Sequence, residues 1–250
     1  MKKILILGVA ALLFFSCSKD EDEKLPGRYI SDFVGKADMV SDKGVDYQMQ
    51  LYYDLSSNQL KAQHKRDAWD LALGCNPQNP NLFVNPGLLM AVAPTGSSDF
   101  QKDFEPENYE FNYERAGSYF RHGLMQKALK QADSMNSPVF VIDMGRDINS
   151  KERGYKLLQI VDYRSGEYKL KIANLDHSNT RQFNIPINQR FNNLYIKFNT
   201  PGEILQLEPP KEEWDLYFGK YMERLYDGSD SVDYSVTGCL LNTYGTKAYQ

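Results

Sequence analysis

The sequence predicts a mainly β fold of antiparallel sheets with one short helix near residues 118–136. The chain contains 17 tyrosines and 13 phenylalanines, and aromatic residues favour strands. Its apolar runs are short and are separated by Asn-Pro, Pro-Gly and Ser-Gly pairs, which mark turns. One segment alone, Ser118 to Asn136, spaces its apolar residues as a helix does.

The N-terminus has the layout of a secretory signal peptide over residues 1–17. Lys2 and Lys3 precede an apolar run from Ile4 to Phe15, followed by Ser16 and Cys17. The run is too short for a membrane span, which needs ~20 apolar residues. A small residue before a cysteine resembles the lipobox of bacterial lipoproteins, so we expect Cys17 to carry lipid after cleavage. The alternative is an ordinary signal peptide that contains a cysteine.

Residues 18–27 read as an acidic tether, because a polar run follows Cys17 at once. A lysine and acidic cluster beside the cysteine resembles the export signal of some Gram-negative surface lipoproteins. More than one acyl chain is needed for stable anchoring, at about 0.8 kcal/mol per buried methylene. We therefore predict an outer-membrane lipoprotein, exposed at the cell surface and held to the membrane by its lipid anchor only.

The net charge argues against one class of function, and the remaining cysteines raise the question of a disulfide. The net charge is −4 and no basic stripe occurs, which argues against a nucleic-acid-binding protein. Cys75 and Cys239 remain after Cys17 and could pair outside the cytoplasm. Their spacing forms no pattern, so the sequence leaves open whether they do.

Both tryptophans of the chain begin the same short motif, Trp-Asp-Leu, which indicates an internal repeat. We predict a β domain over residues 28–193 and a second, incomplete repeat over 194–250 that packs on the first. A single composite assembly or a truncated chain would also explain the short second unit. The matching segments are Leu51–Leu55 with Trp69-Asp70-Leu71-Ala72-Leu73, and Leu194–Phe198 with Trp214-Asp215-Leu216-Tyr217-Phe218.

The Trp-led segments predict structural anchors. If each is a strand, Trp69 and Leu71 lie on one face, because side chains alternate along a strand. We expect the two indoles to be core anchors, with Leu71 and Leu216 beside them. Asp70 and Asp215 then face the other side, where each is expected to cap a turn or to pair with a Lys or Arg rather than to perform acid–base chemistry.

The remaining elements follow in order along the chain. The helix over 118–136 is expected to end at Asn136 and Pro138. The other predictions are a tight hairpin over 82–92 around Asn85-Pro86-Gly87, strands at 109–113, 139–144, 155–163 and 168–174, a short edge strand at 183–186, and a strand at 234–241.

Several segments of the chain together resemble the HmuY family of Gram-negative surface lipoproteins. They are the two Trp-Asp-Leu motifs, the strands that precede them, and the segments 139–142 and 155–160. The similarity covers roughly residues 45–245. It implies an antiparallel β fold with a pocket for a porphyrin. It also implies haem as the bound cofactor, and transfer of haem to a TonB-dependent outer-membrane receptor as partner.

The resemblance further implies two axial ligands for the haem iron, drawn from His or Met in the middle segment. His122 lies where the second ligand would fall and Met125 follows three residues later, so we predict these two as haem ligand candidates. On one helix face they would make a poor pair for opposite sides of one iron. Either could serve singly, with Met90 or Met135 as the second ligand. Packing of the methionines within the helix, and exposure of His122, are the alternatives.

The other two histidines are weaker candidates, and no enzyme motif is present. His64 lies in a charged loop and His177 in an Asp-rich turn. The sequence contains no phosphate loop, zinc-protease motif, Cys-x-x-Cys pair or nucleophile elbow, so we predict no catalytic residue, no metal site and no enzyme. We expect either a lipid-anchored extracytoplasmic binding protein that captures haem or porphyrin, or a non-haem surface module for an outer-membrane protein, peptide or glycan.

Overall fold

The computed structural model describes residues 48–115, 122–132, 136–200 and 203–247. The chain divides into two units, Met1–Met39 and Val40–Gln250, and every described residue belongs to the second. The predicted signal peptide, the lipidation site Cys17 and the tether lie outside the described residues. Among the described residues, no helix has the length and apolarity that a membrane crossing requires.

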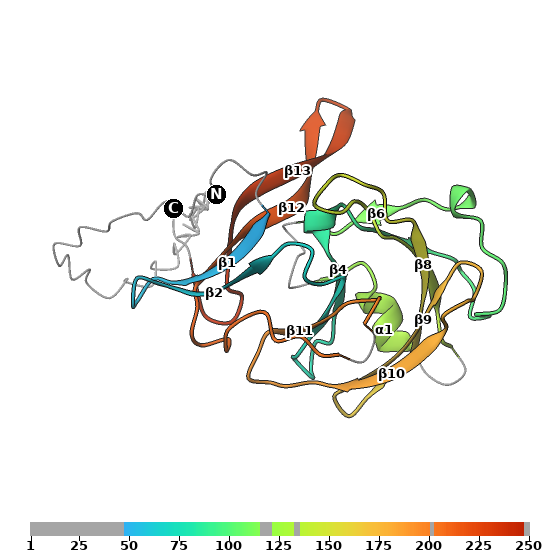
Figure 1. The fold of residues 1–250 in the computed structure, drawn as a ribbon, viewed down its shortest axis with the longest axis horizontal. Helices are drawn as coiled ribbons and strands as arrows, with labels where there is room; N and C mark the ends of the chain where they lie inside the picture. Colours follow the sequence, from blue (N-terminus) through green and yellow to red (C-terminus); the bar gives the residue numbers. More distant parts are fainter. Residues whose placement is uncertain (1–47, 116–121, 133–135, 201–202, 248–250) are drawn as a thin grey trace, which may run out of the picture. The chain divides into compact units, whose positions relative to one another are not determined.

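Three antiparallel sheets make up the described fold, which confirms the predicted mainly β class (Figure 1). The four-stranded sheet has the order β13-β12-β1-β2. Its strands are β1 (Met49–Asp54), β2 (Gln59–Lys65), β12 (Leu216–Asp227) and β13 (Asp230–Leu241).

The six-stranded sheet has the order β10-β9-β8-β7-β5-β6, and the three-stranded sheet the order β11-β3-β4. The six strands are β5 (Ala91–Pro94), β6 (Asn112–Tyr113), β7 (Val139–Asp143), β8 (Tyr155–Arg164), β9 (Glu167–Asn174) and β10 (Arg181–Pro186). The three strands are β3 (Leu71–Gly74), β4 (Leu82–Val84) and β11 (Asn193–Ile196).

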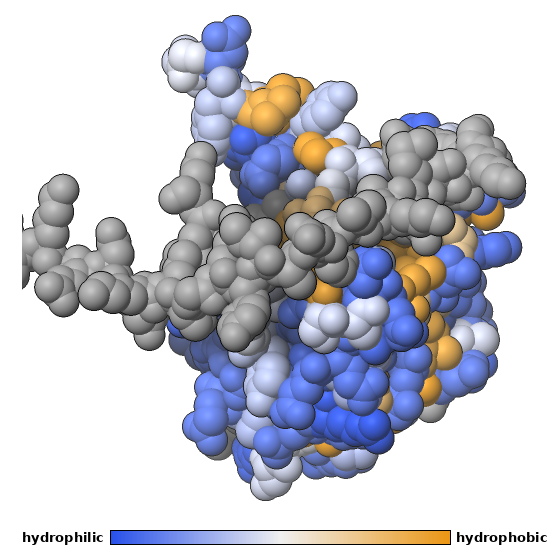
Figure 2. Space-filling view, turned by 90° about the vertical axis from the view of Figure 1, so that its left-hand side faces the viewer, coloured by the Kyte–Doolittle hydropathy of each residue, from blue (hydrophilic) through white to orange (hydrophobic). Residues whose placement is uncertain are grey.

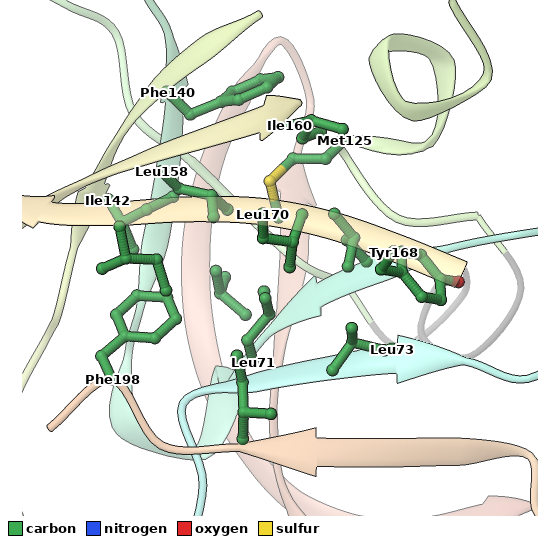
Figure 3. Close-up of a cluster of buried hydrophobic side chains, with 14 of the residues drawn as sticks. Leu71, Leu73, Met125, Phe140, Ile142, Leu158, Ile160, Tyr168, Leu170 and Phe198 are labelled. Atoms are coloured by element: carbon green, nitrogen blue, oxygen red, sulfur yellow. The ribbon is translucent and has the colours of Figure 1, made fainter. Parts of the chain in front are cut away.

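The principal core lies between these last two sheets. Leu71 and Leu73 from β3 pack with Leu158 and Leu170 from the six-stranded sheet, and all four are fully buried (Figure 3). The helix α1 (Gln126–Gln131) packs Leu129 against the same cluster. Burial of whole apolar side chains contributes about 1.5–3 kcal/mol each, so this cluster is the main source of stability.

The helix is shorter than predicted. The expected helix ran over 118–136, but residues 122–123 are irregular and 124–125 form a turn, while 116–121 and 133–135 lie outside the described residues. Gly123 explains the late start: a Cβ there would lie 2.2 Å from the Leu82 carbonyl oxygen. Its backbone N donates to Asn81 Oδ1 at 2.9 Å. Close packing on β4 therefore overrides the helical spacing.

The predicted hairpin over 82–92 is wrong. β4 and β5 belong to different sheets, joined by a short 3-10 helix, η1 (Pro86–Leu88). Asn85 caps this helix, since its side chain accepts from Gly87 N at 2.9 Å. Leu89 then takes a left-handed conformation with φ 59°. The cap and the left-handed residue redirect the chain from one sheet to the other.

The strands after the helix follow the sequence prediction. β7, β8 and β9 are consecutive neighbours, and β10 lies at the sheet edge as expected. The segment at 109–113 is mostly irregular and contains only the two-residue β6, preceded by the 3-10 helix η2 (Pro106–Asn108). The predicted strand at 234–241 is the second half of β13, which pairs with β12 over its whole length.

The Trp-led segments depart from the predicted alternation. Trp69 and Asp70 precede β3, which begins at Leu71. Trp69 packs with Ala72 in an aromatic cluster, whereas Leu71 packs with Leu73 in the principal core. The prediction that Trp69 and Leu71 share a face is therefore wrong, because the chain is still turning at Asp70.

The two predicted units exchange strands. β11, from the second unit, pairs with β3 of the first, and β1 pairs with β12 of the second. The register is the same in both: Leu194 lies opposite Leu73, and Leu51 opposite Phe218. Each Trp-led strand is thus hydrogen-bonded to the strand that opens the other unit.

An aromatic cluster joins the two Trp-led segments. Trp69 and Trp214 are 1% and 3% exposed and belong to one buried cluster with Tyr52, Tyr195 and Tyr217. The hydroxyls of Tyr52 and Tyr195 lie 3.1 Å apart, within hydrogen-bonding distance. Because corresponding residues from both units meet in it, this cluster ties the four-stranded sheet to the three-stranded sheet.

Candidate functional site

The structure does not bring the two predicted haem ligands together. His122 is exposed, with Nδ1 3.4 Å from Gln126 Oε1. Met125 has no exposed surface, and its side chain points into the principal core near Leu170 (Figure 3). Iron ligation by Met125 would require the core to open.

The other candidate ligands are also occupied or undescribed. Met90 is fully buried in the principal core, with Sδ 3.8 Å from Arg153 Nη1. Met135 lies outside the described residues. The ring of His64 packs on Tyr52, and burial lowers its pKa. His177 Nε2 lies 3.7 Å from Asp103 Oδ1. Within the described part of the chain, no three His, Cys, Asp or Glu side chains gather as a metal site would require.

The two remaining cysteines are free thiols. Cys75 is buried in the principal core, and burial raises the pKa of its thiol to about 12. Cys239 is exposed on β13. Neither thiol has the lowered pKa that marks a reactive or metal-binding cysteine.

A largely apolar cleft of about 470 Å³ lies beside α1, and we call it the α1 cleft. Val92 from β5 and Phe140 from β7 form part of its floor, while Leu124 and Lys127 stand at the exposed side. The lining residues among those described are Val92, Pro94, Gly96, Ser97, Ser98, Asn112, Leu124, Lys127, Ala128, Gln131, Asn136, Pro138, Val139 and Phe140.

Strand pairing explains why this cleft is apolar. β5 and β7 are antiparallel neighbours, with Val92 opposite Ile142 and Pro94 opposite Phe140. Val92 and Phe140 both belong to the core face that α1 covers. The small side chain of Ala128 on α1 leaves space between helix and sheet. Leu124 remains 43% exposed at the opening.

Lys127 is the one charged residue among the described lining of the α1 cleft. An apolar floor with a single cation at the rim suits a flat, apolar ligand that carries a carboxylate. The described lining contains no His, Met, Cys or Tyr, which are the residues that ligate haem iron.

A second cavity, of about 560 Å³, is polar, and we call it the asparagine cavity. His122 lines this cavity and not the α1 cleft. Its lining residues are Gly74, Cys75, Asn76, Pro77, Asn79, Asn81, His122, Gln189, Phe191, Asn192, Asn193, Lys211, Thr243 and Tyr244.

A buried carboxyl group supports the wall of each cavity. Glu114 is 1% exposed, and Leu124 N donates to its two oxygens at 3.2 and 3.3 Å. Burial raises the pKa of Glu114 to about 8. Glu208 is 3% exposed and accepts from Asn193 N at 2.7 Å and from the Tyr195 hydroxyl at 3.0 Å. Burial raises the pKa of Glu208 to about 7.

As site residues, sequence reasoning named only His122 of the asparagine cavity and none that lines the α1 cleft. The apolar residues of the α1 cleft have the same pattern as core residues, so no local signal separates them. The asparagine cavity draws residues from loops that are distant in sequence. Its one visible signal is the density of amides in Asn76–Asn81 and Gln189–Asn193.

Comparison with known proteins identifies the family. The family model described as HmuY protein matches residues 46–172, which is half of the chain. No curated protein and no solved structure matches the chain. The matched range begins just before β1 and ends within β9, so it includes Trp69 and every described residue that lines the α1 cleft. The chain therefore belongs to the HmuY family.

Proposed function

We propose that this protein is a lipid-anchored, extracytoplasmic binding protein that captures haem or a related porphyrin in the α1 cleft. The observation that carries the proposal is an apolar cleft with a cationic rim in a chain of the HmuY family. Small-ligand sites are concave, mostly apolar and about 300–1,000 Å³ in volume, a range that includes this cleft.

The chemistry of a porphyrin matches the cleft. Its broad apolar face would lie against Val92 and Phe140, which are 2% and 4% exposed. One of its propionate groups would reach Lys127 at the rim, where an ion pair remains partly solvated. The ring and one carboxylate then supply most of the binding free energy.

Iron ligation plays a smaller part in this proposal. No described lining residue of the cleft can ligate haem iron, and Met125 is enclosed in the core. Met135, one of the two alternatives for a second ligand in the sequence analysis, directly precedes Asn136, which lines the cleft. We expect metal-free protoporphyrin to bind with an affinity close to that of haemin.

Titration of the mature protein with haemin and with protoporphyrin IX tests the proposal. Leu124→Asp and Lys127→Glu should each weaken both ligands by about tenfold or more, because each removes apolar area or reverses the rim charge. Leu60→Asp and Lys151→Glu are matched controls, since both residues are exposed and neither lines the cleft. An absorption spectrum that stays that of free haemin, or equal losses in the controls, would reject the proposal.

Lipid anchoring is tested separately. Cys17→Ser should prevent acylation and release the protein from the membrane fraction. Labelling with a radioactive or alkyne-bearing fatty acid should mark the wild-type chain and not the variant. Protease accessibility on intact cells then tests surface exposure. A Cys17→Ser chain that stays in the membrane fraction would contradict the anchor.

A second candidate function is docking to an outer-membrane partner through the β12–β13 hairpin. Leu225, Val232 and Tyr234 share one face of its outer half and are 47%, 59% and 55% exposed. Figure 2 shows apolar surface on this projecting hairpin. Exposed apolar patches mark interaction sites, and tyrosine is common at interfaces.

The partner proposed for the hairpin is a TonB-dependent receptor. Val232→Ser with Tyr234→Ser should abolish receptor capture from solubilised outer membranes and leave haemin binding unchanged. Leu60→Ser with Leu55→Ser on β2 and its turn is the matched control. Capture of the receptor at the wild-type level by the hairpin variant would exclude this surface.

A further inference from the structure

We infer that the asparagine cavity is a binding site for a neutral saccharide. It is separate from the α1 cleft, because no described residue lines both. The inference therefore does not depend on haem capture.

Amide side chains with unused hydrogen-bonding groups line the cavity. Asn76 Oδ1 accepts from Gln78 N at 3.0 Å, and Asn192 Nδ2 donates to Asn242 Oδ1 at 2.9 Å. The remaining atoms, Asn76 Nδ2 and Asn192 Oδ1, have no partner among the described residues. The side-chain amide of Gln189 also makes no hydrogen bond with any described residue. Together these groups offer both donors and acceptors, which is the combination that sugar hydroxyls require.

An aromatic ring completes the site. Tyr244 lines the cavity and is 51% exposed. Its hydroxyl lies 3.1 Å from Glu212 Oε1, and Lys211 Nζ lies 4.5 Å from its ring centroid. These contacts hold the ring at the cavity edge. An exposed ring of fixed orientation gives the C–H face of a sugar a surface on which to stack.

Asn242 positions the two sides of this site relative to one another. Its Oδ1 accepts from both Asn192 Nδ2 at 2.9 Å and Tyr244 N at 3.0 Å. Its own Nδ2 donates to the carbonyls of Lys211 and Trp214 at 2.8 and 2.6 Å. Asn242 is 1% exposed, so these hydrogen bonds are shielded from water. A ligand would meet amide and ring already in place, which lowers the cost of binding.

The charges around the cavity favour a neutral ligand. Among the lining residues that the structure describes, there is no carboxylate, and Lys211 is the single permanent cation. Lys211 is already placed over the Tyr244 ring. The nearby Glu208 is 3% exposed, and its oxygens accept from Asn193 and Tyr195. An anionic ligand would find only Lys211 to pair with, and the Glu212 carboxylate beside the cavity already accepts from the Tyr244 hydroxyl.

Binding of the full mature chain to an array of neutral and acidic oligosaccharides tests this inference. We expect binding to neutral glycans. In calorimetric titration with the best neutral glycan, Gln189→Ala and Tyr244→Ala should each weaken binding by about tenfold. Gln182→Ala and Tyr226→Ala are matched controls, because both residues are exposed and neither lines the cavity. Haemin titration of the Gln189→Ala chain should be unchanged, which separates this site from the α1 cleft.

Three outcomes would overturn the inference. The first is an array on which no neutral glycan binds. The second is neutral-glycan binding that Gln189→Ala and Tyr244→Ala leave intact. The third is binding restricted to acidic glycans and lost in Lys211→Ala, which would assign the cavity to an anion.

Discussion

The Trp69 and Trp214 segments form the same hydrogen bonds in different surroundings. Phe198 N donates to Asp70 Oδ2 at 2.8 Å, and Leu55 N donates to Asp215 Oδ2 at 2.8 Å. Asp70 is fully buried and forms an ion pair with Arg153 at 2.5 Å. Asp215 is only half-buried and accepts instead from Thr246 Oγ1 at 2.9 Å.

The asparagines that follow extend the correspondence. Asn85 Nδ2 donates to the Trp69 carbonyl at 2.9 Å, and Asn242 Nδ2 to the Trp214 carbonyl at 2.6 Å. After Asn85 the chain enters the principal core, since Leu88 is 1% exposed. After Asn242 it reaches the exposed wall of the asparagine cavity. The same local hydrogen bonds therefore support the core in one segment and a surface cavity in the other.

The largest difference is expected between the two aspartates. Asp70→Ala should lower the free energy of unfolding by about 3–5 kcal/mol, because it leaves the mostly buried Arg153 without its carboxylate. Asp215→Ala should cost only about 1–2 kcal/mol, the value of lost hydrogen bonds at a half-exposed site. Urea denaturation of both variants measures the difference. Equal losses would show that the two surroundings do not matter.

The two buried acids, Glu114 beside the α1 cleft and Glu208 beside the asparagine cavity, should differ in how strongly they make the stability of the protein depend on pH. The pKa of Glu114 in the folded protein is about 8, above the ~4.3 of an unfolded chain. The neutral carboxyl is therefore favoured by folding. Its stabilising effect is complete below pH ~4.3 and is lost as the pH rises toward 8.

Glu114→Gln should consequently stabilise the protein by a few kcal/mol at pH 8 to 9 and have little effect at pH 4. Glu208→Gln should stabilise the protein less at pH 8 to 9, because the Glu208 carboxylate accepts hydrogen bonds from both Asn193 and Tyr195. Thermal unfolding between pH 4 and pH 9 is the measurement. A Glu114→Gln variant whose stability keeps the pH dependence of the wild type would contradict the assignment to Glu114.

Loss of the indole nitrogen should change stability by a smaller amount, and by a different amount at Trp69 than at Trp214. Trp69 Nε1 donates to Gln50 Oε1 at 2.8 Å, whereas Trp214 Nε1 is buried with no partner among the described residues. Trp69→Phe should therefore destabilise the protein by about 1 kcal/mol more than Trp214→Phe. Chemical denaturation of the two variants provides the comparison, and a larger loss for Trp214→Phe would refute it.

The smallest effect is expected at the hairpin that follows Trp214. Tyr226 is 75% exposed, and Tyr226→Ser should change stability by no more than about 0.5 kcal/mol. A loss of 2 kcal/mol in the same denaturation assay would mean that the Tyr226 ring packs against the rest of the protein.

The sequence predicted the mainly β class and the strands of β7 to β10, because alternation and turn residues are local signals. It also identified the Trp-Asp-Leu words and, through them, the family. The match between Asn85 and Asn242 was missed, because a single asparagine carries no pattern when its neighbours differ. The long β12–β13 hairpin had a signal in Gly228-Ser229, the two-residue loop between Asp227 and Asp230, which sequence reasoning overlooked.

Tertiary contacts determine the parts of the fold that the sequence did not predict. The helix starts late because Gly123 packs against β4, and the chain leaves β4 for another sheet because Asn85 and Leu89 redirect it. Neither contact is visible in a local window. The spacing of His122 and Met125 likewise cannot show that Met125 points inward while His122 remains exposed.

The crystal structure of the mature protein with bound haemin tests the central claim most directly. We predict a porphyrin ring in the α1 cleft, in contact with Leu124 and Phe140 and with a propionate near Lys127. Haemin found in the asparagine cavity beside His122, with the α1 cleft empty, would contradict the proposal.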